Sequence, residues 1–151
     1  MKIYNLKEKP EYIKEYFELC SKEWGSYNDL EEFNQKIATK VERFLKGEDD
    51  KIILVLILVE ENELIGFISL FKYDGDERRD LTPWYATMCV KEKYRSKGYS
   101  KILNNAILEE AKRVGYQKVY LKSALINYYE KFGAKYIETL NNGEKLFYIE
   151  L

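Results

Sequence analysis

A short basic loop, Arg95-Ser96-Lys97-Gly98-Tyr99-Ser100, joins an apolar, strand-like run to an amphipathic, helix-like segment. The first N–H groups of a helix have no intrahelical partners, and the aligned peptide dipoles add partial positive charge there. Arg95 and Lys97 increase this charge, and Gly98 lacks the Cβ that would hold a ligand away from the main chain. The loop can therefore hold a phosphate, although its spacing alone favours an ordinary basic turn that caps a helix.

The residue types present limit the chemistry of the rest of the chain. The sequence has no histidine, which excludes Ser-His-Asp and Cys-His catalysis and removes the commonest transition-metal ligand, so we expect no metal site. The motifs Gly-x-x-x-x-Gly-Lys-Ser/Thr and Gly-x-Gly-x-x-Gly are absent, which disfavours nucleotide binding of the P-loop or dinucleotide type. Cys20 and Cys89 are far apart and predict two reduced, largely buried thiols.

Composition and charge narrow the class of protein. The 151 residues predict a single domain over 1–151, and a formal charge of −1 gives no basis for non-specific nucleic-acid binding. The longest apolar run, Ile52 to Val59, is too short to span a bilayer, and the N-terminus has no apolar signal core. We therefore expect a cytoplasmic protein with no nucleic-acid or membrane partner.

Apolar residues at helical spacing predict the helices that flank these motifs. The first extends from Pro10 to near Gly25, the second from about Leu30 to Gly47, and the third follows the basic loop and stops at Gly115. A short helix is expected over Asn127 to Phe132.

Runs of β-branched and apolar residues predict the strands. Lys51–Val59 is apolar throughout, which indicates a strand covered on both faces, and Leu64–Phe71 returns antiparallel to it. The other predicted strands are Lys2–Leu6, Trp84–Val90, Lys118–Leu121, and a terminal hairpin of Lys135–Leu140 with Lys145–Leu151. Asp74–Arg79 is expected to be a solvated loop. The fold class is α+β, with a mixed, mostly antiparallel sheet and helices on both faces.

A strand ending in Val90, then four residues, then Arg-x-x-Gly-x-small at the start of a helix resembles the cofactor loop of the GNAT superfamily, the acyl-CoA-dependent N-acetyltransferases. Tyr129-Glu130-Lys131-Phe132-Gly133 is similar to the Tyr-Glu-Lys-x-Gly segment of that superfamily, and Asp80-Leu81-Thr82-Pro83-Trp84 to one branch of small bacterial members. The resemblance extends from about Leu64 to Leu151. Tyr99 replaces a usual aliphatic residue, and Ser100 a usual Gly or Ala.

This resemblance implies a role for each residue of the loop and of the strand before it. The pyrophosphate of acetyl-CoA, the co-substrate, would lie on the N–H groups of about Ser96 to Ser100, beside Arg95 and Lys97. The pantetheine arm would bond main-chain groups near Cys89 and Val90, where the strand separates from its parallel neighbour. One N–H there would polarise the thioester carbonyl.

Tyr129 is the expected catalytic acid, because it occupies the tyrosine position of the Tyr-Glu-Lys-x-Gly segment. A phenol within hydrogen-bond reach can give a proton to the departing CoA thiolate. Tyr128 is the neighbour most easily confused with it. Cys89 is expected to be a structural thiol rather than a nucleophile.

The acceptor side is less defined by the sequence. Glu23 and Asp80 are candidates for the general base, although either is more often a solvated surface carboxylate. Four aromatic residues are candidates for the wall of an acceptor pocket, with core or rim positions as the alternative: Trp24, Tyr27, Trp84 and Tyr85.

These expectations define an N-acetyltransferase that moves an acetyl group from acetyl-CoA to a primary amine of a small molecule or peptide, by direct attack in a ternary complex. The alternative is a catalytically weak module of the same fold that binds or senses acyl-CoA. The terminal hairpin offers an edge for a homodimer.

Overall fold

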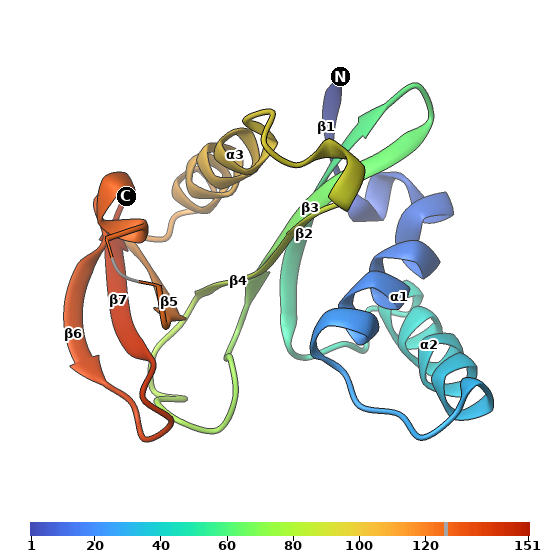
Figure 1. Cartoon of the computed structure of the whole chain (residues 1–151), viewed down its shortest axis with the longest axis horizontal. Helices are drawn as coiled ribbons and strands as arrows, with labels where there is room; N and C mark the ends of the chain where they lie inside the picture. The colour runs from blue at the N-terminus through green and yellow to red at the C-terminus, as the bar shows by residue number, and fades with distance from the viewer. Residues whose placement is uncertain (126) are drawn as a thin grey trace.

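The computed structural model describes residues 1–125 and 127–151 and contains a seven-stranded sheet with three α-helices (Figure 1). The strands are β1 (Lys2–Asn5), β2 (Ile52–Glu60), β3 (Glu63–Phe71), β4 (Trp84–Val90), β5 (Lys118–Ser123), β6 (Lys135–Thr139) and β7 (Lys145–Glu150). The helices are α1 (Ile13–Trp24), α2 (Leu30–Leu45) and α3 (Tyr99–Arg113). This α+β architecture confirms the predicted fold class.

The sheet has the order β1-β2-β3-β4-β5-β7-β6, and every neighbouring pair is antiparallel except β4 and β5. These two parallel strands pair at one position, Trp84 opposite Tyr120, beside a bond from the Tyr120 N–H to the Pro83 carbonyl (2.9 Å). Beyond this point β4 remains paired with β3 and has no register partner in β5. The sheet therefore opens between its two central strands.

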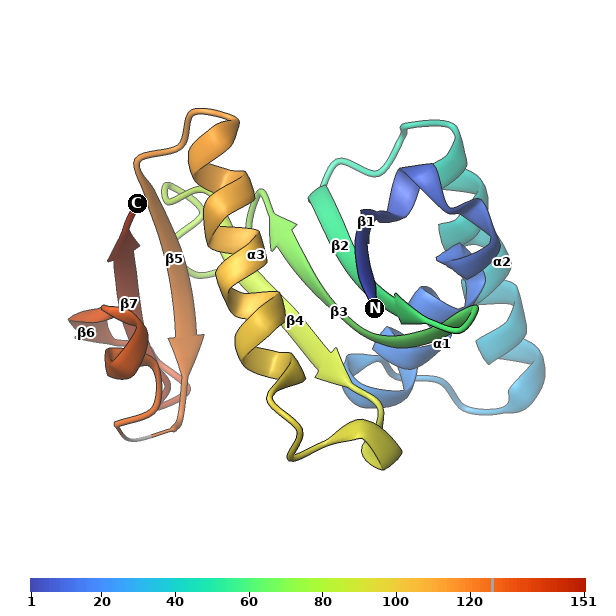
Figure 2. The ribbon, with the colours of Figure 1, turned by 90° about the horizontal axis from the view of Figure 1, so that it is seen from above.

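Helices cover both faces of the sheet, α3 on one and α1 with α2 on the other (Figures 1 and 2). The side chains of β2 alternate between the two faces. Leu54, Leu56 and Leu58 pack in the cluster that contains Leu103 and Ile107 of α3, whereas Val55, Ile57 and Val59 pack with residues of α1 and α2. This alternation confirms that the apolar strand is covered on both sides, and it separates the core into two layers.

Two expected helices differ in type from the prediction. The segment Pro10–Tyr12 is a 3₁₀ turn that precedes α1, in which the Ile13 N–H bonds to the Pro10 carbonyl. The short helix expected over Asn127–Phe132 is a 3₁₀ turn over Tyr129–Phe132, ended by Gly133 at φ 87°. The elements that follow these two turns, α1 and β6, still lie where they were expected.

The loop between β3 and β4 is the clearest departure from the sequence prediction. Asp74–Arg79 is exposed or partly exposed, as expected of a solvated loop, but it is also bonded to the β6–β7 hairpin. The Arg78 guanidinium pairs with Asp80 (3.0 Å) and with Glu138, and the Asn141 N–H donates to the Glu77 carboxylate (3.1 Å). Partners more than fifty residues away in sequence hold this loop, so no local pattern indicated its structure.

Candidate functional site

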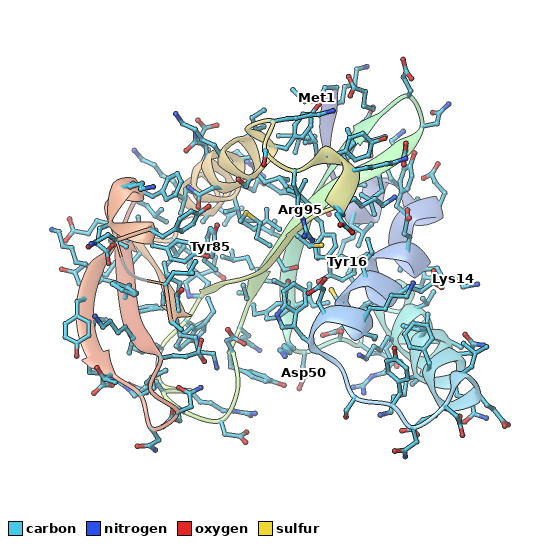
Figure 3. The ribbon with its side chains drawn as sticks, in the orientation of Figure 1. Met1, Lys14, Tyr16, Asp50, Tyr85 and Arg95 are labelled. Carbon is cyan, nitrogen blue, oxygen red and sulfur yellow. The ribbon has the colours of Figure 1, made fainter. Side chains whose placement is uncertain are left out.

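A β-bulge interrupts β4 at the centre of the opening. The register of β4 against β3 shifts between Phe67 and Ser69, and Thr87 has a φ of 47°, a left-handed value that is uncommon for a β-branched residue. The Thr87 hydroxyl donates to the Ser69 hydroxyl (2.6 Å), which shares a second bond with the Tyr16 hydroxyl (2.7 Å). Tyr16 extends from α1 toward the sheet (Figure 3). This chain of hydroxyls therefore fastens the bulge to α1.

The loop that follows β4 is anchored at one end and open at the other. The Tyr94 hydroxyl donates to the Glu63 carboxylate, which also pairs with the Lys93 ammonium (2.8 Å). These bonds lower the pKa of Glu63, Lys93 being the larger cause. Further along, Gly98 has a φ of 83°, and a Cβ built there would meet no heavy atom within 4 Å. The main chain at Gly98 is therefore open to a ligand.

The start of α3 supplies backbone donors to this open end. The first bond that closes the helix joins the Ile102 N–H to the Gly98 carbonyl (3.3 Å), and no side chain caps the helix. The preceding helical N–H groups of Tyr99, Ser100 and Lys101 have no intrahelical acceptor. Arg95 to Gly98 are exposed, and Tyr99 and Ser100 are partly exposed. An anion can reach these groups from solvent.

Arg95 also supports the loop from within. Its Nε donates to the Val90 carbonyl (2.9 Å), and Figure 3 shows the side chain beneath the loop, beside β4. The Val90 carbonyl, expected to meet the pantetheine arm, is therefore already engaged, although a carbonyl oxygen can accept a second bond. Lys97 is exposed, with its Nζ 5.8 Å from the centre of the Tyr94 ring.

Two cavities adjoin the opening, and both are lined by Trp24 and Met88. The first, which the basic loop lines, is called the loop cavity and has a volume of about 360 Å³. The second, which Tyr85, Thr87 and Tyr129 line, is called the distal cavity and has a volume of about 490 Å³. The other residues that line the loop cavity are Glu23, Cys89, Val90, Tyr94, Arg95, Ser96, Gly98, Tyr99 and Ser100. Seven of the eight residues predicted to bind the cofactor are in this list, and Lys97 lies beside the cavity rather than in its wall.

Tyr129 lines the distal cavity. Its ring meets those of Tyr128 and Tyr85 edge to face, with centroids 4.8 and 5.8 Å apart. Figure 3 shows Tyr85 on the side of β4 that faces β5. Burial, and to a smaller extent the neighbouring Tyr128, raise the pKa of Tyr129. The phenol therefore keeps its proton at neutral pH.

Both cysteines are free thiols. Cys89 is buried in β4, and burial together with Glu23 raises its pKa, although Arg95 and Lys91 oppose this shift. Burial likewise raises the pKa of Cys20 to about 12. A protonated thiol is a poor nucleophile, so the chemistry of Cys89 agrees with a structural role.

The structure separates the two candidates for a general base. Glu23 lines the loop cavity, next in sequence to Trp24, which lines both cavities. Asp80 lines neither cavity, and its carboxylate is held by Arg78, which lowers its pKa. Glu23 is therefore the better placed of the two.

The structure also separates the four aromatic residues that were candidates for the wall of the acceptor pocket. Trp24 and Tyr85 line the distal cavity. Trp84 is fully buried, with its indole N–H bonded to the Leu81 carbonyl (2.8 Å), and is a core residue. Tyr27 lies in a separate groove between α1 and α2, where its ring contacts Phe33 (4.8 Å). Trp84 therefore has the core position given as the alternative, and Tyr27 lies outside the distal cavity.

Four charged residues of the distal cavity were not singled out from the sequence: Lys51, Asp74, Lys122 and Glu144. Burial raises the pKa of Asp74, and Glu144 adds to the shift, whereas Lys122 and Lys51 oppose it. The four come from separate elements, so no spacing in the sequence indicated that they meet.

Within residues 1–125 and 127–151, no group of three or more Cys, Asp or Glu side chains is arranged to hold a metal ion. No helix in the described part of the chain is long and apolar enough to cross a membrane.

Residues 10–134 match the model of the acetyltransferase (GNAT) family, so the chain belongs to the GNAT acetyltransferase family. The opened sheet, the bulged β4 and the uncapped start of α3 are the structural features found at the residues that suggested this family. No curated protein matches the sequence.

Solved structures share the fold at low sequence identity. An aminoglycoside 6'-N-acetyltransferase complexed with coenzyme A superimposes with a TM-score of 0.71 at 18% identity, covering 99% of this chain and 97% of that one. An aminoglycoside 6'-N-acetyltransferase from Enterococcus faecium gives 0.69 at 18% identity, with the same coverage. A PaiA N-acetyltransferase from Thermoplasma acidophilum, in complex with coenzyme A, gives 0.65 at 19% identity and covers all of both chains.

Proposed function

We propose that this protein transfers an acetyl group from acetyl-CoA to a primary amine of a small molecule or peptide. The observation that supports this most directly is the separation of β4 from β5 beyond the Trp84–Tyr120 pair, next to the open N–H groups of α3. A ligand with a phosphate at one end and a flexible arm can bind both features at once. Two structural neighbours are complexes with coenzyme A, which supports a ligand of the same kind here.

The residues of the loop cavity fit the pyrophosphate and the pantetheine arm. Ser96 to Ser100 supply backbone N–H groups, and Gly98 leaves the main chain open to the phosphates. Arg95 and Lys97 add positive charge at the cavity mouth. The main chain of Cys89 and Val90, which has no β5 partner, lies along the expected path of the arm.

When bound, acetyl-CoA supplies an activated carbonyl whose sulfur is a good leaving group. A backbone N–H near the bulge would stabilise negative charge on the carbonyl oxygen as the amine nitrogen attacks and the C–N bond forms. The C–S bond breaks, and Tyr129 donates a proton to the sulfur. Its raised pKa keeps that proton available at neutral pH.

The amine must lose a proton before it attacks, because a lysine-like amine has a pKa of about 10.4. Glu23 is the carboxylate we propose as the acceptor of that proton, directly or through water, since it lines the loop cavity near Met88 and Trp24. The nitrogen loses a second proton to solvent as the amide forms, Glu23 releases its proton to solvent, and Tyr129 regains one from solvent. Overall, the ammonium and the thioester give an amide, a free thiol and one proton.

Acetyl-CoA binding is the first test of this proposal. A ligand present at 100 times its Kd adds about 2.7 kcal/mol to the free energy of unfolding. For a chain of this size we expect a rise in melting temperature of about 5–10 °C. No rise with millimolar acetyl-CoA would contradict the proposal.

A pair of charge variants locates the binding site. Lys97→Gln removes a cation beside the loop cavity and should weaken acetyl-CoA binding severalfold. Lys112→Gln removes another exposed cation, at the other end of α3, and should leave binding unchanged. Equal effects of the two variants would argue against a site at the start of α3.

Turnover separates the enzyme from a module that only binds acyl-CoA. Release of free thiol from acetyl-CoA should increase when amines are added, from a panel of polyamines, amino acids, aminoglycosides and peptides. Binding without release by any amine would favour the sensing alternative.

A further inference from the structure

The distal cavity contains charged side chains of both signs. Lys51 comes from the segment before β2, Asp74 from the loop after β3, Lys122 from β5 and Glu144 from the β6–β7 hairpin. All four are partly buried. They line the same cavity as Tyr129, so an amine that attacks a thioester held next to Tyr129 must also meet these charges.

The four charges do not neutralise one another by direct contact. In the described part of the chain, no salt bridge within 4.0 Å joins either lysine to either carboxylate. The Lys122 Nζ instead donates to the Asp74 backbone carbonyl (2.8 Å), and the Lys51 Nζ lies 4.8 Å from the centre of the Phe71 ring. Each ammonium has three donors, so both lysines have donors left for a ligand.

This balance of charge is poorly suited to a carboxylate-free polycation. A polyamine would gain from Asp74 and Glu144, but Lys51 and Lys122 would repel it within the same partly buried space. A molecule with an ammonium and a carboxylate would pair with both kinds of side chain. Charge complementarity of this type selects among ligands even when it adds little net affinity.

Resting on the proposed function, we infer that the acceptor is an amine that also bears an acidic group, such as an amino acid or a short peptide with a free carboxylate. Asp74 and Glu144 attract the amine in its ammonium form, before it loses a proton to Glu23, and Lys51 and Lys122 hold the acidic group. The walls formed by Trp24 and Tyr85 leave about 490 Å³, enough for an acceptor of this size. Burial of Asp74 strengthens its attraction for a cation relative to water.

Equilibrium binding tests this inference without requiring turnover. With the protein saturated with CoA, which cannot transfer an acetyl group, calorimetry would compare each acidic amine with its decarboxylated and carboxamide analogues. Lysine, cadaverine and lysinamide form one such set, and alanine, ethylamine and alaninamide another. We expect the carboxylate form to bind about tenfold tighter in each set, equivalent to about 1.4 kcal/mol. Tighter binding by the carboxylate-free members, or no binding by any acidic amine, would overturn the inference.

Charge variants assign the preference to the two lysines. Lys122→Gln and Lys51→Gln should each abolish the preference for the carboxylate form, whereas Lys122→Arg should retain it because the positive charge remains. Lys145→Gln removes an exposed cation of β7 outside the cavity and should change nothing. A preference that survives both Lys→Gln variants would also overturn the inference. Acetylation of polyamines but of no acidic amine would also overturn the inference, while the proposed acetyltransferase function would stand.

Discussion

Tyr129 and Cys89 are two reactive side chains whose surroundings make them chemically different. Both have raised pKa values, chiefly because of burial. A phenol that keeps its proton can act as an acid, whereas a thiol that keeps its proton is a weak nucleophile. Burial therefore favours Tyr129 as a proton donor and disfavours a covalent acetyl-enzyme on Cys89.

Replacing Tyr129 with phenylalanine tests its role as the acid. We expect kcat to fall by about 10²-fold with little change in the KM for acetyl-CoA, since the hydroxyl acts on the departing sulfur. Tyr128→Phe is the matched control and should retain most of the activity. Any alkaline decline of the wild-type rate due to Tyr129 should have its midpoint above pH 10, because burial raises its pKa from 10.0. A Tyr129→Phe enzyme with unchanged kcat would reject this assignment.

Cys89→Ser tests whether the thiol takes part in the chemistry. Direct transfer predicts that the variant keeps its rate within about threefold, whereas loss of a covalent nucleophile would cost several orders of magnitude. Iodoacetamide should also modify Cys89 of the folded protein slowly at pH 8, since the side chain is only 9% exposed and its pKa is raised. An acetylated Cys89 trapped by mass spectrometry would contradict direct transfer.

Among the elements, β4 has the largest influence on the site. One edge pairs with β3 along most of its length, and the other edge meets β5 only at Trp84. Residues of β4 from Tyr85 to Met88 line the distal cavity, and those from Met88 onward line the loop cavity. The bulge at Thr87 lies beside this change. The close approach of β3 keeps this strand in place, and Gly66 makes that approach possible.

Gly66→Ala should therefore affect both stability and binding. A Cβ on Gly66 would lie 2.6 Å from the Cys89 carbonyl oxygen and 3.2 Å from a methyl carbon of Leu103, so β4 or α3 must move. We expect a loss of about 1–3 kcal/mol in the free energy of unfolding, measured in urea, and weaker binding of acetyl-CoA.

Gly143→Ala provides the comparison for this variant. Gly143 has a φ of 89° with open space around it, so alanine there adds backbone strain without a collision. It should lower stability by about 1 kcal/mol and leave acetyl-CoA affinity unchanged. If Gly66→Ala binds acetyl-CoA as tightly as Gly143→Ala does, β4 does not depend on this contact.

At the scale of the whole molecule, ionisable groups on the surface set how stability depends on pH. Hydrogen bonds lower the pKa of several carboxyl groups: Glu32, Glu63, Asp80 and Glu110. A carboxyl group with a lowered folded pKa stabilises the fold above its unfolded pKa, and this contribution is lost as the pH falls through the folded value. Asp74 has a raised pKa, so its charged form opposes folding at neutral pH.

We therefore expect the urea midpoint to be nearly constant from pH 8 to pH 6, because the chain has no histidine, and to fall as the pH drops below about 4.5. Glu63→Gln should reduce the fall of the urea midpoint at acid pH. Asp74→Asn should raise stability at pH 7 and lose this advantage as Asp74 of the wild type becomes protonated. A wild-type transition centred between pH 6 and pH 7 would contradict this account.

Local sequence was sufficient for most of the elements, whereas the residues of the loop cavity were selected with the help of the resemblance to a known family. The apolar spacing in β2 and α3 and the glycine and cations of the basic loop act within a few residues of chain, so their consequences are visible without a fold. Seven of the eight predicted cofactor residues consequently line one cavity. Only the tertiary structure decided the distal cavity, because Asp74, Lys122 and Glu144 come together through strand pairing between distant segments. Sheet register is set by packing over the whole core, and no short stretch of sequence encodes it.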